Sequence, residues 1–427
     1  MKSKLPKVLM LGWEFPPLIN GGLGVACHDL STAMSDIADI TMVVPKSSPE
    51  FKMKNMRLLG INNLDPAMFE HFPSNYHRPL PFKFHSLPAD LNPYYNENEA
   101  FPNDGRRSLL NSRDGLNVFD IDSLYGGDVI NKVMHFAEIT SKLATTLEFD
   151  VIHAHDWMTM LAGIKIKELS GKPLVMHIHS LEVDRGGADS KGWVYDLEKV
   201  GMEVADLIIP VSNFTAENIK KYYGISAQKM SVVHNGSTPV KTFKSRRNFK
   251  EKTVLFVGRL TRQKGPEKFL DIATRVLEKD PDVRFVMAGT GDYFKSALET
   301  SSYRSIGNRF HMTGFLNQQK LQYLFSVSDV YCMPSVSEPF GLSAVEAAHF
   351  GIPCVISKQS GVAEVLTGAL KFDYWDSDKA AGYILNLLND NVLRKKVVDD
   401  ASENLRNISW NISAKKIITA YTSRQLI

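Results

Sequence analysis

Short apolar runs alternate with longer amphipathic stretches along most of the chain. Each run is followed by a turn rich in Gly, His or Ser, and then by a stretch in which apolar residues recur with the period of an α-helix. Strands that alternate with helices are typical of parallel sheets built from βαβ units. The predicted strands are residues 8–11, 40–44, 151–155, 174–179 and 207–211 in the first half, and 253–257, 284–288, 330–333 and 353–356 in the second. The predicted helices include residues 25–35, 133–147, 157–169, 266–277 and 342–350.

The alternation stops once, at a polar and basic stretch, and starts again with a new strand. We interpret residues 237–252 as a linker between two α/β domains, residues 1–236 and 253–408. The six Lys and Arg residues within 241–252 are typical of a solvated linker. A docking patch for a membrane or a nucleic acid would have the same composition.

Composition excludes several classes of protein. Of the 427 residues, 44% are hydrophobic, and 50 Lys and Arg face 47 Asp and Glu, for a formal charge of +3. This is the composition of a globular protein, and so small a net charge indicates no nucleic-acid partner. No apolar run is long enough for a transmembrane segment, and the run near the start is too short for a secretion signal. Cys27, Cys332 and Cys354 lack metal-binding or disulfide spacing, so we expect reduced core cysteines and a cytoplasmic location.

The first candidate for chemistry is the glycine-rich turn NGGLG at residues 20–24, between the first strand and the first helix. Gly21 and Gly22 let backbone N–H groups approach an anion, and the N-terminus of the following helix adds positive potential. Glycine also serves tight turns for conformation alone. The turn by itself therefore leaves phosphate binding and a purely structural role equally open.

Two cations follow the first strand of the second domain, in the loop GRLTRQKG at residues 258–265. We expect Arg259 and Lys264 at the carboxyl edge of the sheet, where open α/β sheets bind their ligands. A guanidinium and an ammonium there suit a diphosphate whose negative charge grows as a leaving group departs. Two isolated surface cations would have the same sequence pattern.

A third motif, PSVSEPFGLSAVE at residues 334–346, follows another predicted strand. Because proline favours the first turn of a helix, we expect Glu338 just before a helix and Glu346 about two turns inside it. The free N–H groups near Gly341 and Leu342 would face a second phosphate. In this arrangement the Glu338 carboxylate could accept hydrogen bonds from sugar hydroxyls, and the Glu346 carboxylate could accept two hydrogen bonds from a ribose diol. Without a ligand, Glu338 would be a charge on the helix dipole and Glu346 an exposed carboxylate.

Four histidines occur as two H-x-H pairs at the ends of predicted strands: His153, His155, His177 and His179. Each pair places both rings on one face of its strand, as a metal site requires. No carboxylate or thiolate stands at a matching spacing. We therefore expect no metal ion at these histidines.

The E-x7-E spacing of Glu338 and Glu346, taken with GRLTRQKG and NGGLG, resembles glycosyltransferase family 4. Seven further motifs occur in the order of that family: VIHAHDW (151–157), HIHSLE (177–182), VSNFTAENI (211–219), VVHNG (232–236), AGTGD (288–292), TGFL (313–316) and GIPCVISKQSGVAEVL (351–366). The resemblance implies the GT-B fold, an α/β architecture of two Rossmann-like parallel-sheet domains that face a deep cleft. It also implies that residues 409–427 form a helix crossing back to the first domain.

The resemblance further implies sugar transfer from a nucleotide-sugar, with retention of anomeric configuration and without a metal ion or other cofactor. Arg259 and Lys264 match the family's diphosphate-binding pair, and Gly341 and Leu342 stand at the matching helix start. Glu346 matches the carboxylate that holds the donor ribose. In the same way, Glu338 matches the glutamate beside the 3- and 4-hydroxyls of the donor sugar.

The first domain carries the remaining matches. Gly21 and Gly22 match the loop that closes over the donor, and His179 matches the histidine near the 6-hydroxyl of the donor sugar. Asp156 falls in the HDW turn beside the acceptor. Glycogen and starch synthases usually have Lys before the two glycines, and Asn20 departs from that pattern.

Within the family, the HAHDWMT turn and the long insertion are similar to those of glycogen and starch synthases. This implies a glucosyltransferase that moves glucose from ADP- or UDP-glucose to the non-reducing end of an α-1,4-glucan. A mannosyl- or other hexosyltransferase with a lipid-linked or small acceptor stays open, as does a non-catalytic nucleotide-sugar-binding protein. The intact cations and glutamates argue against the last. The donor base and the oligomeric state are not predicted.

The irregular region at about residues 46–125 is rich in Pro, Asn and aromatic residues, and we expect it to be an insertion in the first domain. Aromatic faces pack well on the apolar faces of glucose rings. Tyr94 and Tyr95 are therefore candidates for binding a glucan acceptor. Most aromatic rings in such a region instead fill a small core of its own.

Overall fold

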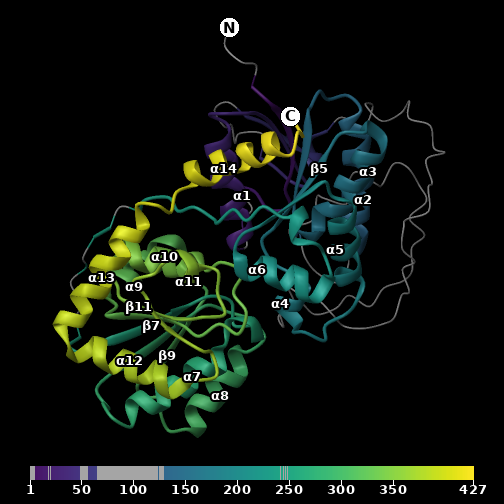
Figure 1. The fold of residues 1–427 in the computed structure, drawn as a ribbon. Coiled ribbons are helices and arrows are strands. Elements are labelled where there is room, and N and C mark those ends of the chain that lie inside the picture. The colour runs from purple at the N-terminus through teal and green to yellow at the C-terminus, as the bar shows by residue number, and fades with distance from the viewer. Residues whose placement is uncertain are drawn as a thin grey trace, which may run out of the picture.

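The chain folds into two lobes, each built on a parallel β-sheet (Figure 1). The computed structural model describes residues 5–17, 19, 21–48, 56–64, 124, 129–240, 242, 243, 245, 247 and 249–427. Within this part of the chain each sheet has six strands. The expected architecture of two parallel-sheet α/β domains is confirmed.

The first sheet has the order β3-β2-β1-β4-β5-β6. Its strands are apolar on both faces because helices cover both. Leu9 and Leu11 pack on the face covered by α2, α3 and α5, while Val8 and Met10 pack on the face covered by α1 and α14. The strands are β1 (Lys7–Leu11), β2 (Asp39–Val44), β3 (Met56–Gly60), β4 (Val151–His155), β5 (Leu174–Ile178) and β6 (Leu207–Pro210). The helices are α1 (Gly22–Met34), α2 (Val129–Ala144), α3 (Trp157–Ser170), α4 (Glu182–Gly186), α5 (Trp193–Val204) and α6 (Asn213–Asn218).

The second sheet has the order β12-β11-β10-β7-β8-β9 and the same two-sided core. Val254 and Phe256 face one apolar cluster, and Leu255 between them faces the other. The strands are β7 (Thr253–Val257), β8 (Arg284–Ala288), β9 (Phe310–Gly314), β10 (Val330–Met333), β11 (Cys354–Ser357) and β12 (Leu370–Phe372). The helices are α7 (Pro266–Leu277), α8 (Phe294–Tyr303), α9 (Gln318–Val327), α10 (Leu342–His349), α11 (Val362–Val365), α12 (Ser377–Asn389), α13 (Asn391–Leu405) and α14 (Trp410–Ser423).

The last helix, α14, returns to the first lobe and lies beside α1 (Figure 1). The Ser409 side chain caps its start by accepting from the backbone N–H of Ile412 at 3.3 Å. Ile417 and Tyr421 are fully buried in the core that α14 shares with α1 and the first sheet. The predicted crossing helix is thereby confirmed.

Three strands were missed by the hydrophobic pattern, namely β3, β9 and β12. All three lie at the edges of their sheets, and several of their residues are only half-buried, so their apolar pattern is weak. β3 falls inside residues 46–125, which we expected to be entirely an insertion. That expectation was wrong for Met56–Gly60, which pairs with β2 as a regular strand of the sheet.

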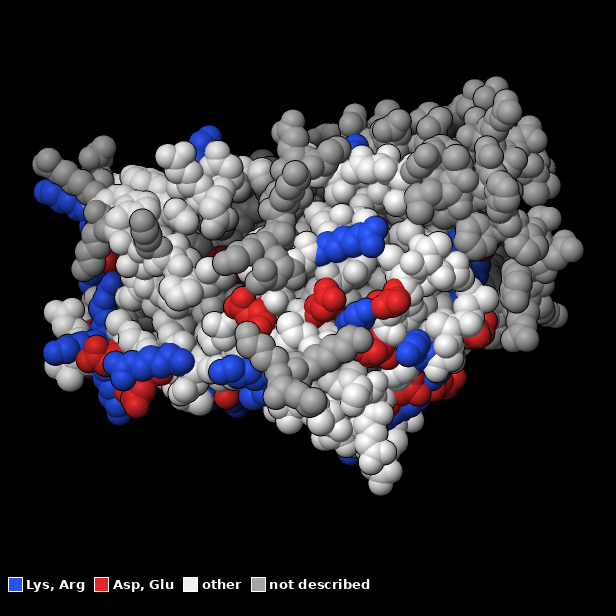
Figure 2. Space-filling model, turned by 90° about the horizontal axis from the view of Figure 1, so that it is seen from above, with Lys and Arg blue, Asp and Glu red and all other residues white. Residues whose placement is uncertain are grey.

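The surface and the cysteines agree with the composition. On the face shown in Figure 2, acidic and basic side chains lie among one another, with no continuous surface of one sign among the described residues. Cys27, Cys332 and Cys354 are buried and free. Among the described residues, no helix is both long enough and apolar enough to cross a membrane.

We expect the Ile417→Ala variant to lower the free energy of unfolding by about 2–5 kcal/mol, because a buried aliphatic side chain is lost between α14 and the first sheet. Denaturant unfolding measures the change. The exposed neighbour Lys416 supplies the matched control, and Lys416→Ala should stay within about 0.5 kcal/mol of the parent. Equal effects of the two variants would contradict the packing of α14 on the first lobe.

Candidate active site

The two lobes meet where the carboxyl ends of their strands carry loops. The Ser337 hydroxyl in the second lobe donates to Asp184 Oδ1 in the first at 2.5 Å, and Arg262 donates to the carbonyl of Gly186 at 3.1 Å. Ser212, which caps α6, donates to the carbonyl of Pro339 at 2.6 Å. These contacts hold the motif loops of both lobes against each other.

Lys264 and Glu338 form an ion pair at this junction. Lys264 Nζ lies 2.5 Å from Glu338 Oε2, and the Ser335 hydroxyl donates to the same oxygen at 3.2 Å. Glu338 is only 5% exposed, and its backbone is held in a bridge to the segment at Ser360. A nearly buried carboxylate requires such a partner, because an uncompensated charge there would be costly. Arg259 lies on the same loop as Lys264, after β7, and is exposed.

Gly265 allows that loop to approach the Glu338 segment. Its φ is +68°, and a Cβ at this position would lie 2.3 Å from the carbonyl oxygen of Pro334. Lys264 therefore reaches Glu338 from a turn that only glycine can close.

Helix α10 begins at Leu342, as the hydrophobic pattern of residues 342–350 predicted, and not at Pro339, as the preference of proline for a first helical turn suggested. Pro339 does not open the helix; Gly341 precedes it with φ +109°, and Leu342 is its first residue. A Cβ at Gly341 would lie 3.0 Å from Val362 and 3.1 Å from Met333, so packing as well as conformation requires glycine there. Glu346 consequently lies only just over one turn into the helix, and not two.

Glu346 has an unusual environment for a carboxylate. It is half-buried, and burial raises its pKa to about 7. Among the described residues, no hydrogen bond or ion pair reaches its carboxylate. Two neighbouring acceptor oxygens without a protein partner suit a pair of adjacent hydroxyl groups.

The glycine turn of the first lobe faces the start of α10. A Cβ built on Gly22 would lie 3.9 Å from Leu342 Cδ1, and Leu342 packs against cores of both lobes. Gly21 has an extended φ of −172°, and a Cβ there would meet nothing within 4 Å among the described residues. Neither conformation nor packing explains glycine at Gly21, which favours the approach of a ligand to its backbone.

The four histidines lie on one face of the first sheet, under α1 and α14. His155 Nδ1 lies 2.9 Å from His179 Nε2, and His153 Nε2 lies 3.1 Å from His177 Nδ1. Tyr421 of α14 contacts His153 Nδ1. Burial lowers the pKa of His179 to about 3, so its ring is neutral at physiological pH and acts through hydrogen bonds.

Asp156 anchors the segment that carries His179. Its carboxylate accepts the backbone N–H groups of His179 at 2.6 Å and Ser180 at 3.3 Å, across the end of β5. Asp156 has φ +57°, a conformation that non-glycine residues seldom adopt. Burial raises its pKa to about 7, while the two N–H donors and the charge of Arg185 act in the opposite direction. Asp156 thus positions the His179 backbone.

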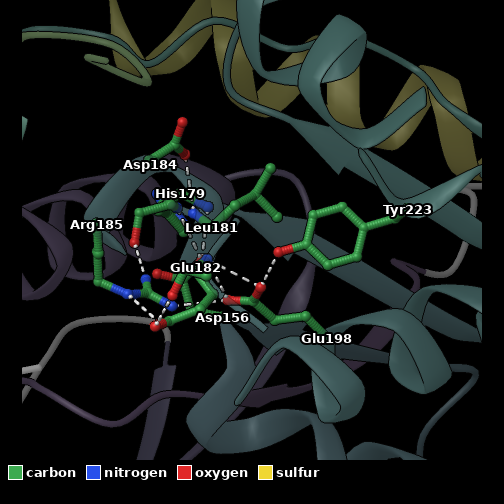
Figure 3. A network of polar contacts seen from close by, with 10 residues as sticks. Asp156, His179, Leu181, Glu182, Asp184, Arg185, Glu198 and Tyr223 are labelled. Atoms are coloured by element: carbon green, nitrogen blue, oxygen red, sulfur yellow. Dashed lines mark hydrogen bonds and ion pairs between the residues drawn. The ribbon is translucent and has the colours of Figure 1, made fainter. Parts of the chain in front are cut away.

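A second set of polar contacts, which the sequence motifs did not reveal, continues from this point (Figure 3). Arg185 donates to Ser180 Oγ and to Glu198 Oε1, each at 2.7 Å, and to Glu182 Oε2 at 3.1 Å. Glu198 is fully buried and also accepts the Tyr223 hydroxyl and the Glu182 backbone N–H. Glu182 and Arg185 lie close together in the sequence, in SLEVDR at residues 180–185. Glu198 and Tyr223 lie further along the chain, so no single sequence motif contains the whole set.

The structure thus brings Lys264, Glu338, Gly341 and Leu342 together with Gly22, and it sets His179 beside Asp156. Asn20, Tyr94 and Tyr95 lie outside the described residues.

The spacing argument against a metal ion at the histidines overlooked Cys27. This residue lies on α1, far away in the sequence, yet its Sγ and ring nitrogens of His155 and His179 all lie within 4.8 Å of one another.

Known proteins with similar sequences are glycosyltransferases. An uncharacterized glycosyltransferase of Methanocaldococcus jannaschii is 27% identical in an alignment of 441 positions, gaps included, that covers 97% of each chain. A glycogen synthase of Mycobacterium tuberculosis is 24% identical over 84% of this chain and 80% of its own. A D-inositol 3-phosphate glycosyltransferase of Corynebacterium diphtheriae is 29% identical over 64% of this chain and 71% of its own.

Solved structures share the fold along the whole chain. Sucrose-phosphate synthase from Thermosynechococcus elongatus superposes with a TM-score of 0.69 at 16% identity, over 98% of both chains. The Anabaena protein HepE, solved in complex with UDP-glucose, gives a TM-score of 0.65 at 16% identity, over 98% of this chain and 99% of its own.

Two family models account for most of the sequence. The one described as the starch synthase catalytic domain matches residues 7–231, and the one described as glycosyl transferases group 1 matches residues 237–404. The first alone spans more than half of the chain. The chain therefore belongs to the glycosyltransferase family that joins a starch synthase catalytic domain to a group 1 glycosyl transferase domain.

Proposed function

We propose that the protein transfers glucose from ADP- or UDP-glucose to the non-reducing end of an α-1,4-glucan, with retention of anomeric configuration. The observation that carries the proposal is the Lys264–Glu338 ion pair beside the start of α10, opposite the glycine turn of the first lobe. The starch synthase match and the glycogen synthase relative support a glucan acceptor. The free, buried cysteines support a reducing, cytoplasmic setting.

The ion pair accounts for how one site can bind both the diphosphate and the sugar of the donor. When a diphosphate arrives, Lys264 Nζ exchanges Glu338 for a phosphate oxygen, with Arg259 on the same loop. Glu338 is then left to accept hydrogen bonds from the sugar hydroxyls. The first-turn N–H groups of α10, beginning at Leu342, face the other phosphate, and Glu346 accepts the ribose diol. His179 donates to or accepts from the 6-hydroxyl as a neutral ring.

The transfer step needs no protein nucleophile. The bond from the anomeric carbon to the phosphate oxygen breaks, and the acceptor hydroxyl oxygen bonds to that carbon on the same face. The acceptor proton passes to the departing phosphate, and a nucleoside diphosphate is released. Lys264, Arg259 and the α10 N-terminus stabilise the growing negative charge, a task that many transferases assign to a divalent metal ion.

A hexosyltransferase with a small acceptor is the second candidate, favoured by the inositol-phosphate glycosyltransferase relative. A panel of ADP-, UDP- and GDP-sugars, each with glycogen, maltoheptaose or inositol phosphate, separates the two. We expect glucose transfer to glycogen, undiminished by EDTA. Transfer to the small acceptor alone would replace the glucan proposal. Donor binding without transfer to any acceptor would favour a non-catalytic binding protein.

We expect Lys264→Ala to lower kcat by about 10²–10³, because one preorganised cation at the leaving phosphate is lost. Lys268, in the first turn of α7, provides the control. Its ion-pair partner is Asp271 on the same helix, at 3.9 Å, and not a residue of the proposed site. Steady-state kinetics of Lys268→Ala should match the parent. Normal turnover of Lys264→Ala would remove Lys264 from the diphosphate site.

We expect Glu346→Gln to raise the KM for the donor and to stabilise the folded chain above neutral pH. Unfolded, Glu346 ionises near its ordinary pKa of about 4.3, whereas burial raises the folded pKa to about 7. The folded state therefore binds more protons across this window, and parental stability falls as pH rises through it.

Thermal melts of parent and Glu346→Gln should accordingly differ at pH 8, with the variant melting higher, and should converge below about pH 4. The exposed Glu299 on α8 supplies the control, because Glu299→Gln should change neither KM nor the pH profile of melting. An unchanged donor KM in Glu346→Gln would place the ribose elsewhere.

A further inference from the structure

Cys27, His155 and His179 come from three different elements and meet at the carboxyl end of the first sheet. Cys27 lies on α1, His155 ends β4, and His179 directly follows β5. The cysteine sulfur and one ring nitrogen of each histidine all lie within 4.8 Å of one another. We propose that these three side chains bind a borderline-soft divalent transition metal ion of the Zn²⁺ class.

The hydrogen bonds among the histidines leave ring nitrogens unsatisfied. His155 is fully buried, and its Nε2 has no partner among the described residues. His179 Nδ1 and His177 Nε2 are likewise buried without a partner there. A buried polar atom without a partner costs about 1–3 kcal/mol, and the pairing of the rings with one another does not remove that cost. A metal ion bound to these rings would change the hydrogen bonds between them and would accept a lone pair from a ring nitrogen directly.

The donor set is that of a zinc site. One thiolate and two neutral imidazoles are the ligands that Zn²⁺ selects, and a fourth position stays open for water or substrate. Tetrahedral coordination at bond lengths of about 2.0–2.3 Å brings ligand atoms to about 3.3–3.8 Å from one another, so modest side-chain rotation closes the present spacing. Cys27 binds as the thiolate and releases its proton to solvent.

The surroundings favour a cation. Burial raises the pKa of the Cys27 thiol, and the negative charges of Asp156 and Glu14 act in the same direction because they oppose a thiolate. The same negative potential attracts a dication. Asp156 also fixes the position of His179 through its backbone N–H at 2.6 Å. Fixed orientation of a ligand by neighbouring groups is a regular feature of metal sites.

A neighbouring trio, His153, His155 and His177, has a similar spacing but is a poorer site. It shares His155, so one ion at His155 excludes the other arrangement. All three rings are buried, it has no thiolate, and His153 already contacts the Tyr421 hydroxyl and His177. His179 is half-buried and thus gives the Cys27 site a path for the ion from solvent.

The consequence for catalysis rests on the proposed function, whereas metal binding itself does not. Because the ion would engage the ring of His179, it competes with the 6-hydroxyl of the donor sugar. Bound Zn²⁺ should therefore inhibit transfer, and chelation should restore it. This agrees with a transfer step that uses no metal ion.

The test is a titration of the full, untagged chain with Co²⁺, followed by displacement with Zn²⁺. We expect one Co²⁺ per chain, with tetrahedral visible bands and a near-ultraviolet charge-transfer band from the Cys27 thiolate. Cys27→Ser should abolish the charge-transfer band and weaken Zn²⁺ binding by about 10-fold or more. Cys332 is equally buried but lies on β10 in the other lobe, so Cys332→Ser should keep the band.

Each outcome decides the proposal. The absence of any tetrahedral spectrum, or a charge-transfer band that survives Cys27→Ser, overturns it. Tetrahedral bands without charge transfer would move the ion to the histidine trio and also overturn it. Circular dichroism checks folding, and if Cys27→Ser does not fold, His179→Asn, which changes the Cys27 site but not the histidine trio, must weaken Co²⁺ binding equally. Zn²⁺ inhibition of the parent but not of Cys27→Ser is a separate readout, so failure of transferase activity leaves the cobalt result interpretable.

Discussion

The ion pair between Lys264 and Glu338 is the interaction on which the arrangement of the site depends. Glu338 is almost entirely buried, so its charge is tolerable only with the ammonium group at 2.5 Å. That requirement draws the loop after β7 onto the loop after β10, and the turn at Gly265 makes the approach possible. The two groups neutralise each other until a ligand offers Lys264 a phosphate and Glu338 a set of hydroxyls.

The first lobe is tied to this pair through a chain of polar contacts. Ser337, beside Glu338, donates to Asp184, and α4 belongs to the segment that Arg185 and the buried Glu198 hold in place. Asp156 holds the other end of the same segment at His179. The groups proposed to contact the donor sugar from the two lobes are therefore positioned by one continuous network of contacts.

The strands that are buried on both faces were predictable almost residue by residue, because continuous apolar runs bounded by turns mark them clearly. Residues 151–155 and 253–257 are strands with the predicted bounds. Edge strands such as β3 were missed, since half-exposed positions carry little hydrophobic pattern. The hydrophobic pattern placed the start of α10 correctly at Leu342, whereas the proline argument placed it too early, because the preference of proline for a first turn is weaker than the conformation and packing that Gly341 imposes.

By itself the sequence determined the two-sheet fold, its family and the loops that carry candidate site residues, because strand–helix alternation and motif order are local in the chain. Tertiary structure alone decided which charges meet and which are left without partners. Lys264 is neutralised by Glu338, whereas Glu346 is half-buried, has no partner among the described residues, and has a pKa that burial raises to about 7. Cys27 reaches His155 only because α1 packs over the end of β4. Such pairings depend on distances through space between residues far apart in the chain, and no spacing in the sequence encodes them.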